Sequence, residues 1–162
     1  MQNENFWELI HNSKIGANDC GEQADNLSQL LSDLEPPEIV SFDEHLNRKL
    51  IDSYRWDLWA VGYIINGGAS DDGFLYFRGW LIAQGKDYFE AALSDPESAA
   101  NNAIVGAFNE CEDILYVARQ AYEEKTEDEI PTTLSEPSEP TGESWQEDNV
   151  EQKFPKIAAK FA

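Results

Sequence analysis

The chain has 162 residues, 41% of them apolar and 12% aromatic, which is enough for one domain with a hydrophobic core. Its 32 acidic and 11 basic residues give a formal net charge of −21, which argues against binding nucleic acid through phosphates and against an anionic membrane surface. The same charge has two explanations: it attracts a basic partner protein, or it simply keeps the protein soluble.

The two cysteines lie far apart, at Cys20 and Cys111, and neither has a Cys or His at metal-ligand spacing. We therefore predict that each is a small buried apolar residue and that the protein has no metal or other cofactor. The N-terminal sequence MQNENFWELI lacks the basic and apolar regions of a signal peptide, and no apolar run approaches the roughly 20 residues that cross a membrane. These features predict a cytoplasmic protein.

Helical periodicity predicts three amphipathic helices at the start of the chain. The first covers residues 3–15, and the second covers residues 19–34 with Glu22 at capping-box spacing from its start. Two prolines follow, and a third helix covers residues 37–53.

The next stretch, Tyr54–Ile65, is apolar on nearly all sides, which is typical of a helix enclosed by others. Asn66 and two glycines end this helix. Ser70, Asp71 and Asp72 then open another, because a hydroxyl can cap the helix and acids suit the positive end of its dipole. That helix ends at Gly85.

Two more helices are predicted, a short one at residues 86–93 and a long one at residues 107–125. Residues 126–152 contain nine acids and no bases, so they are expected to form a flexible, largely disordered linker. Apolar residues return in residues 153–162, a short segment that either docks on the domain or binds a partner. The sequence thus predicts an all-α, compact, irregular bundle of six or seven helices in residues 1–125, arranged around the buried helix Tyr54–Ile65.

Two charged residues of the central region invite a chemical interpretation. Asp57 lies in the most apolar helix, where it is either a tuned acid or a structural ion pair with Arg78 or Arg55, and the pair is favoured. Arg78 is placed to hold a carboxylate, from Asp57 or from an anionic ligand.

The turn at residues 66–73 is the second candidate. Asn66, Ser70, Asp71 and Asp72 could bind a divalent cation or a substrate, but helix capping explains the same residues, and the spacing matches no calcium or phosphate loop. No catalytic residue is predicted, because no nucleophile and base occur at an informative spacing. Bulky aromatics at helical spacing are more typical of core than of a ligand pocket; they are Trp56, Trp59, Tyr63, Phe77 and Trp80.

Two segments, FWELI at residues 6–10 and WDLWAVGYIINGGASDDGFLYFRGWLI at residues 56–82, resemble a bacterial family known as domain of unknown function 4240. The resemblance covers roughly residues 1–122. It implies that the same polar residues recur in relatives, and it brings no reaction, cofactor or catalytic residue.

These observations favour a non-catalytic protein-binding or regulatory module, for example an inhibitor or immunity-type protein that masks a basic surface. The alternative is a small enzyme or ligand-binding protein that uses Asp57, Asp71, Asp72 and Arg78 around a cleft at residues 66–73.

Overall fold

The computed structural model describes residues 1–132 and 134–162, and all the regular elements in these residues are helices, without a strand. The all-α class is confirmed, with seven α-helices up to residue 126 and an eighth near the end. The elements are α1 (Asn3–Lys14), α2 (Cys20–Ser32), α3 (Pro36–Asp52), α4 (Trp56–Ile65), α5 (Asp71–Ala83), α6 (Lys86–Ser94), η1 (Pro96–Ala100), η2 (Asp113–Leu115), α7 (Val117–Thr126), η3 (Val150–Lys153) and α8 (Pro155–Phe161), where η denotes a 3₁₀ helix.

Side-chain caps set the predicted starts of two helices. The Asp19 carboxylate accepts a hydrogen bond from the Glu22 amide at the start of α2 (2.8 Å), and the Ser70 hydroxyl accepts one from the Gly73 amide at the start of α5 (3.2 Å). Between α3 and α4 the backbone of Arg55 is extended, so the helix predicted to begin at Tyr54 begins at Trp56.

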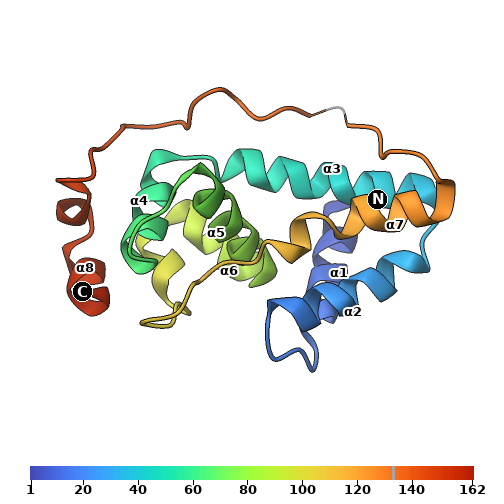
Figure 1. Cartoon of the computed structure of the whole chain (residues 1–162), viewed down its shortest axis with the longest axis horizontal. Coiled ribbons are helices and arrows are strands. Elements are labelled where there is room, and N and C mark those ends of the chain that lie inside the picture. Colours follow the sequence, from blue (N-terminus) through green and yellow to red (C-terminus); the bar gives the residue numbers. More distant parts are fainter. Residues whose placement is uncertain (133) are drawn as a thin grey trace.

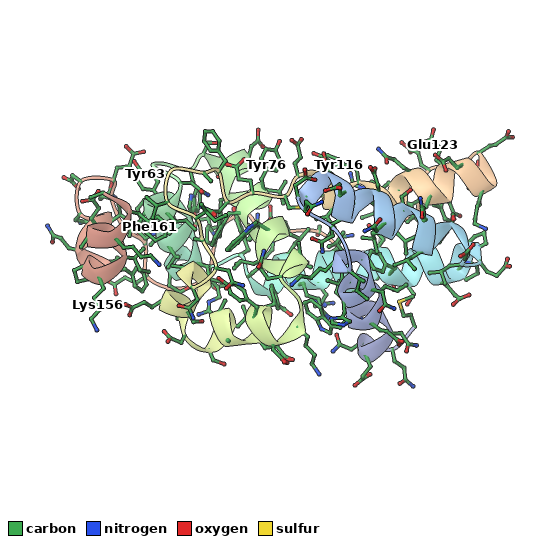
Figure 2. The ribbon with its side chains drawn as sticks, turned by 90° about the horizontal axis from the view of Figure 1, so that it is seen from below. Tyr63, Tyr76, Tyr116, Glu123, Lys156 and Phe161 are labelled. Atoms are coloured by element: carbon green, nitrogen blue, oxygen red, sulfur yellow. A yellow bond between two sulfur atoms is a disulfide. The ribbon has the colours of Figure 1, made fainter. Side chains whose placement is uncertain are left out.

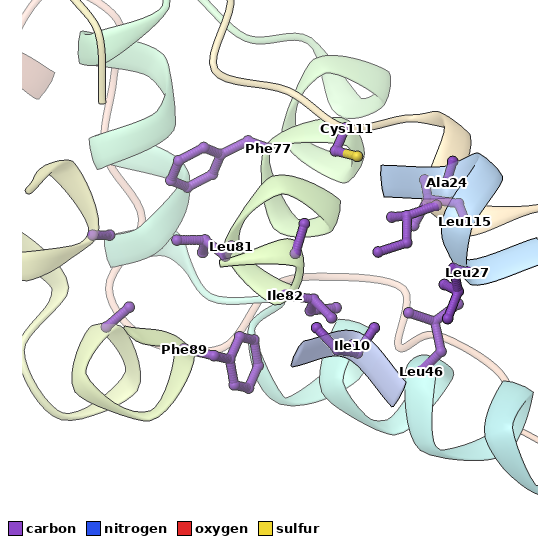
Figure 3. Close-up of a cluster of buried hydrophobic side chains, with 14 of the residues drawn as sticks. Ile10, Ala24, Leu27, Leu46, Phe77, Leu81, Ile82, Phe89, Cys111 and Leu115 are labelled. Carbon is purple, nitrogen blue, oxygen red and sulfur yellow. The ribbon is translucent and has the colours of Figure 1, made fainter. Parts of the chain in front are cut away.

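Helix α5 joins the two halves of the molecule. On one side it contacts α1, α3 and η2, which pack with α2 and α7; on the other it contacts α4 and α6, which pack with η1. Figure 3 shows Phe77 and Leu81 of α5 pointing toward α4, while Ile82 faces Ile10 of α1. Helix α4 is well buried, as predicted, but it lies toward one end of the molecule, between α5 and α8 (Figure 1).

The helix predicted over residues 107–125 is wrong in its first half, because residues 107–112 are not helical and α7 begins only at Val117. The amide of Cys111 donates to the carbonyl of Tyr76 in α5 (2.9 Å) instead of to its own turn. Gly79 permits this contact, since a Cβ there would lie 2.5 Å from the Cys111 carbonyl oxygen. Tertiary packing against α5 therefore overrides the helical periodicity of this segment.

The cysteines form a disulfide between Cys20 and Cys111, with Cα atoms 5.5 Å apart and 91 residues between them in sequence. The prediction of two unlinked apolar cysteines is wrong. Spacing along the chain carries no information about this pairing, because the fold alone brings the start of α2 beside the segment that leads into η2.

The segment after α7 runs along the molecule, past α3, to the far end where α8 packs on α4 (Figure 1). Trp145 and Val150 are buried against Ala60 of α4, and Ile157 of α8 is buried in the main core. The expected flexibility of residues 126–152 stays a prediction, but their described part makes specific contacts with the helical body.

Asp43 is a carboxylate buried on α3, only 2% exposed. One oxygen accepts a hydrogen bond from the Asn47 amide (3.1 Å), and the other has no hydrogen-bond partner among the described residues. Burial raises the pKa of Asp43 above its ordinary value of 3.8, and Arg119 offsets only part of this rise.

We expect Asp43→Asn to raise the free energy of unfolding at pH 7, by an amount on the order of 1 kcal/mol. A raised folded-state pKa means that the protonated form stabilises the fold below pH 3.8 and that this stability is lost as pH rises through the folded pKa. The advantage of the variant should therefore grow from pH 4 to pH 7 in urea unfolding. An advantage that stays constant or shrinks with pH would contradict this assignment.

Replacing Gly79 by Ala should lower the free energy of unfolding by about 1–3 kcal/mol, because the new Cβ meets rigid backbone at Cys111. Gly73→Ala is the matched control in the same helix, since its Cβ would have no heavy atom closer than 3.6 Å. The control should be neutral or slightly stabilising, as alanine favours a helix. Equal urea midpoints for the two variants would contradict this prediction, because they would show that α5 and the Cys111 backbone can move apart at little cost.

Candidate functional site

The polar residues predicted to form one site lie in four separate places. Asp57 pairs with Arg55 through two hydrogen bonds, Nη2 to Oδ2 at 2.7 Å and Nε to Oδ1 at 3.0 Å. Of the two partners considered, the structure selects Arg55. The Asp57 side chain is 40% exposed because it lies in the first turn of α4, so the expectation of a buried carboxylate is wrong. Arg55 also donates to the Leu93 carbonyl (2.8 Å) and so ties α4 to α6.

Asn66 anchors a distant loop. The side-chain oxygen of Asn66 accepts hydrogen bonds from the backbone amide (2.8 Å) and the side-chain amide (3.2 Å) of Asn109. The side-chain amide of Asn66 donates to the backbone carbonyl of Asn109 (3.4 Å). Asn109 is 3% exposed and bonds in turn to both backbone groups of Ile104. The turn after α4 therefore fixes both ends of residues 104–109.

Ser70, Asp71 and Asp72 serve the start of α5. Ser70 is its cap, and both carboxylates are exposed in the first turn, near the positive end of the helix dipole. Within residues 1–132 and 134–162, no group of three or more His, Cys, Asp or Glu side chains is arranged to hold a metal ion.

Arg78 is the most distinctive polar residue of the molecule. Its side chain is 2% exposed, and its guanidinium carbon lies 4.7 Å from the centre of the Tyr54 ring and 4.6 Å from that of Phe74. Nη1 donates to the Leu50 carbonyl (2.7 Å) and to Glu136 (2.8 Å). Burial lowers the pKa of Arg78 and Glu136 raises it, but an arginine keeps its charge. Arg78 thus binds a carboxylate, but neither of the predicted sources supplies it: the partner is Glu136, from beyond α7, and not Asp57 or a ligand.

The predicted aromatic residues divide into a core pair and a surface group. Phe77 is fully buried and stacks with Trp80 at a ring-centre distance of 5.8 Å. Trp56 and Trp59 stack on each other at 5.3 Å, and Tyr63 lies with them toward α8, at the end where Figure 2 labels Lys156 and Phe161. Trp145 covers the surface group, and the centre of its ring lies 5.8 Å from that of Trp56, 6.1 Å from that of Trp59 and 5.4 Å from that of Tyr63.

Sequence reasoning missed Glu136 and Trp145 because both lie in the acidic segment that it treated as solvated. The available signal was Trp145, the sole tryptophan among residues 126–152 and costly to leave in water. Glu136 carries no signal, since eight other acids share its segment.

An exposed apolar loop was also missed. Within residues 104–108 the side chains of Ile104, Val105 and Phe108 are 66%, 54% and 81% exposed. The loop is held at its base by Asn109, as described above, and by the disulfide at Cys111. We call residues 104–108 the apolar loop.

A pocket of about 400 Å³ lies behind the apolar loop, between it and the turn after α1. Ile104 and Phe108 line one side, Lys14 and Asn18 another, and Trp80 contributes an aromatic wall. Exposed apolar side chains beside a pocket of this size form a surface that a protein partner can bind.

Comparison with known proteins gives one family. The family described as "Protein of unknown function (DUF4240)" matches residues 1–124. No curated protein and no solved structure matches the chain. None of the helices in the described ranges has the length and apolar character that crossing a bilayer requires.

Replacing Cys20 and Cys111 together by serine should lower the free energy of unfolding, by at most about 4–5 kcal/mol in the chain-entropy model, because the disulfide closes a long loop. Wild-type protein treated with a thiol reductant should show a matching fall in melting temperature, while the double variant should not respond. A reductant effect of equal size on both proteins would contradict a stabilising disulfide.

Proposed function

The chain belongs to the DUF4240 family, whose function is unknown, and we propose that it is a non-catalytic protein-binding module. The observation that carries the proposal is the apolar loop, which exposes three large apolar side chains on an anchored backbone. An enzyme built on Asp57, Asp71, Asp72 and Arg78 would need these residues in one cleft, whereas they make separate contacts. A protein-binding role does not need them together.

The anchoring of the loop supports binding rather than incidental exposure. Two part-buried asparagine contacts and a disulfide restrain residues 104–111, so little conformational entropy remains to be lost when a partner binds. Large apolar side chains grouped on a surface are typical of protein interfaces.

The expected partner is basic. The chain has a net charge of −21, and Glu110, Glu112 and Asp113 directly follow the apolar loop. Burial and the neighbouring Glu112 raise the pKa of Glu110, so negative charge is crowded at this point. A lysine- or arginine-rich surface would relieve that crowding while Phe108 and Ile104 dock. An inhibitor or immunity-type protein that masks a basic surface fits this description.

The disulfide bears on the cellular compartment of the protein. The cytoplasmic location expected from the sequence stays a prediction, and the Cys20–Cys111 disulfide weighs against it, because disulfides form and persist mainly in oxidising compartments.

The proposal is tested by affinity capture with the full-length protein as bait, at low and high salt. We expect basic proteins to be retained at low salt, and their retention to fall at least about tenfold with Phe108→Ser, because an interface anchor is truncated. Phe108 is 81% exposed, so the variant should keep the stability of the wild type.

Ile15→Ser is the matched control. Ile15 is 67% exposed and lies outside the apolar loop, on the turn that Figure 1 places between α1 and α2. Capture that is unaffected by Phe108→Ser, or equally weakened by both substitutions, would refute the loop as the binding surface.

A further inference from the structure

The second surface of interest is formed by α4, α5 and the turn before α4. It consists of Tyr54, Trp56, Trp59, Tyr63 and Arg78, and we call it the Arg78 face. Residues 136–145 of the same chain lie on this face as an extended segment. This contact is independent of the apolar loop and of the function proposed for it.

The middle of the segment is held through its backbone. The Thr141 amide donates to the Tyr54 carbonyl (3.1 Å), and the Trp56 amide donates to the Thr141 carbonyl (2.9 Å). The two bonds form an isolated parallel β-bridge between Arg55 and Thr141. Such bonds use no side chain of the segment, so other sequences can form them.

Two side chains fix the ends of the segment. Glu136 accepts from Nη1 of Arg78 at 2.8 Å, and Trp145, nine residues later, is 9% exposed among Trp56, Trp59 and Tyr63. The Trp145 indole N–H also donates to the Trp56 carbonyl at 2.7 Å. A carboxylate and an aromatic ring at the two ends, with backbone pairing between them, is a mode of peptide recognition.

The chain's own segment fills this face only in part. Glu136 engages Nη1 alone and is 45% exposed, while Nε of Arg78 is buried without a hydrogen-bond partner among the described residues. A pocket of about 510 Å³ remains between the face and residues 138–144. An arginine pairs best with a carboxylate that accepts two of its hydrogen bonds, whereas Glu136 accepts only one from Arg78.

The Arg78 face and the segment that covers it come from different parts of the chain. Every residue of the Arg78 face lies within the part of the chain that matches the family, residues 1–124, whereas Glu136 and Trp145 lie outside it. The family domain therefore supplies the site, and a segment beyond the domain supplies the occupant.

We propose that the Arg78 face is a peptide-binding site for an extended segment of a partner protein, which places a glutamate on Arg78 and a tryptophan on Trp56, Trp59 and Tyr63. Residues 136–145 are an intramolecular competitor for this site. Because the competitor is tethered, its effective concentration is on the order of millimolar, and only a better-fitting ligand displaces it.

The experiment uses a fluorescent peptide with the sequence of residues 134–147, added to the full-length protein and followed by anisotropy. The wild type should bind it weakly because the tethered copy competes. The double variant Glu136→Gln, Trp145→Ala, with a weakened competitor, should bind the peptide at least about tenfold more tightly. A peptide carrying Gln in place of Glu136 should lose most of this gain, because its neutral amide forms no ion pair with Arg78.

Glu143→Gln is the matched control, since Glu143 is exposed within the same segment and makes no contact with Arg78. It should leave peptide binding at the wild-type level. Circular dichroism should show unchanged helix content in every variant.

The proposal is overturned if the double variant binds the peptide no better than the wild type, or if the Gln-containing peptide binds equally well. Wild-type protein that dimerises by exchanging tails, seen by light scattering, would also overturn it, because a second copy would then be the occupant in place of a partner protein.

Discussion

The close approach of α5 to the backbone at Cys111 is the contact on which most other features depend. Gly79 lets the two backbones meet, and the Cys111 amide then bonds to Tyr76 rather than to a helix of its own. Three consequences follow from this single contact. Residues 107–112 stay out of α7, Cys111 comes within disulfide reach of Cys20, and the preceding residues 104–108 project into solvent.

Arg78, the residue before Gly79, organises a second set of contacts of α5. A buried guanidinium must be surrounded by groups that replace water, and here two aromatic faces, the Leu50 carbonyl and Glu136 do so. The requirement joins α3, α5 and the segment after α7 at one point. It also explains why an acidic segment lies against the body: Glu136 brings the negative charge that the site needs, and Trp145 adds apolar contact.

The two surfaces have different characters. The apolar loop is exposed and is followed in sequence by Glu110, Glu112 and Asp113, which suits a basic partner that docks from solvent. The Arg78 face is already covered, by a segment that satisfies it incompletely, which suits competition between ligands. The two surfaces share no residue, so each can be tested separately.

By itself the sequence determined the helical class, the starts of α2 and α5, and the ability of Arg78 to hold a carboxylate, because caps, periodicity and side-chain chemistry act over a few residues. The family was also recognisable from local motifs, since residues 6–10 and 56–82 are distinctive as strings. Tertiary structure alone decided that Asp57 binds Arg55, that Asn66 anchors Asn109, that the cysteines pair across 91 residues, and that Glu136 is the partner of Arg78. Each of these depends on which distant segments meet in space, and local patterns do not encode that.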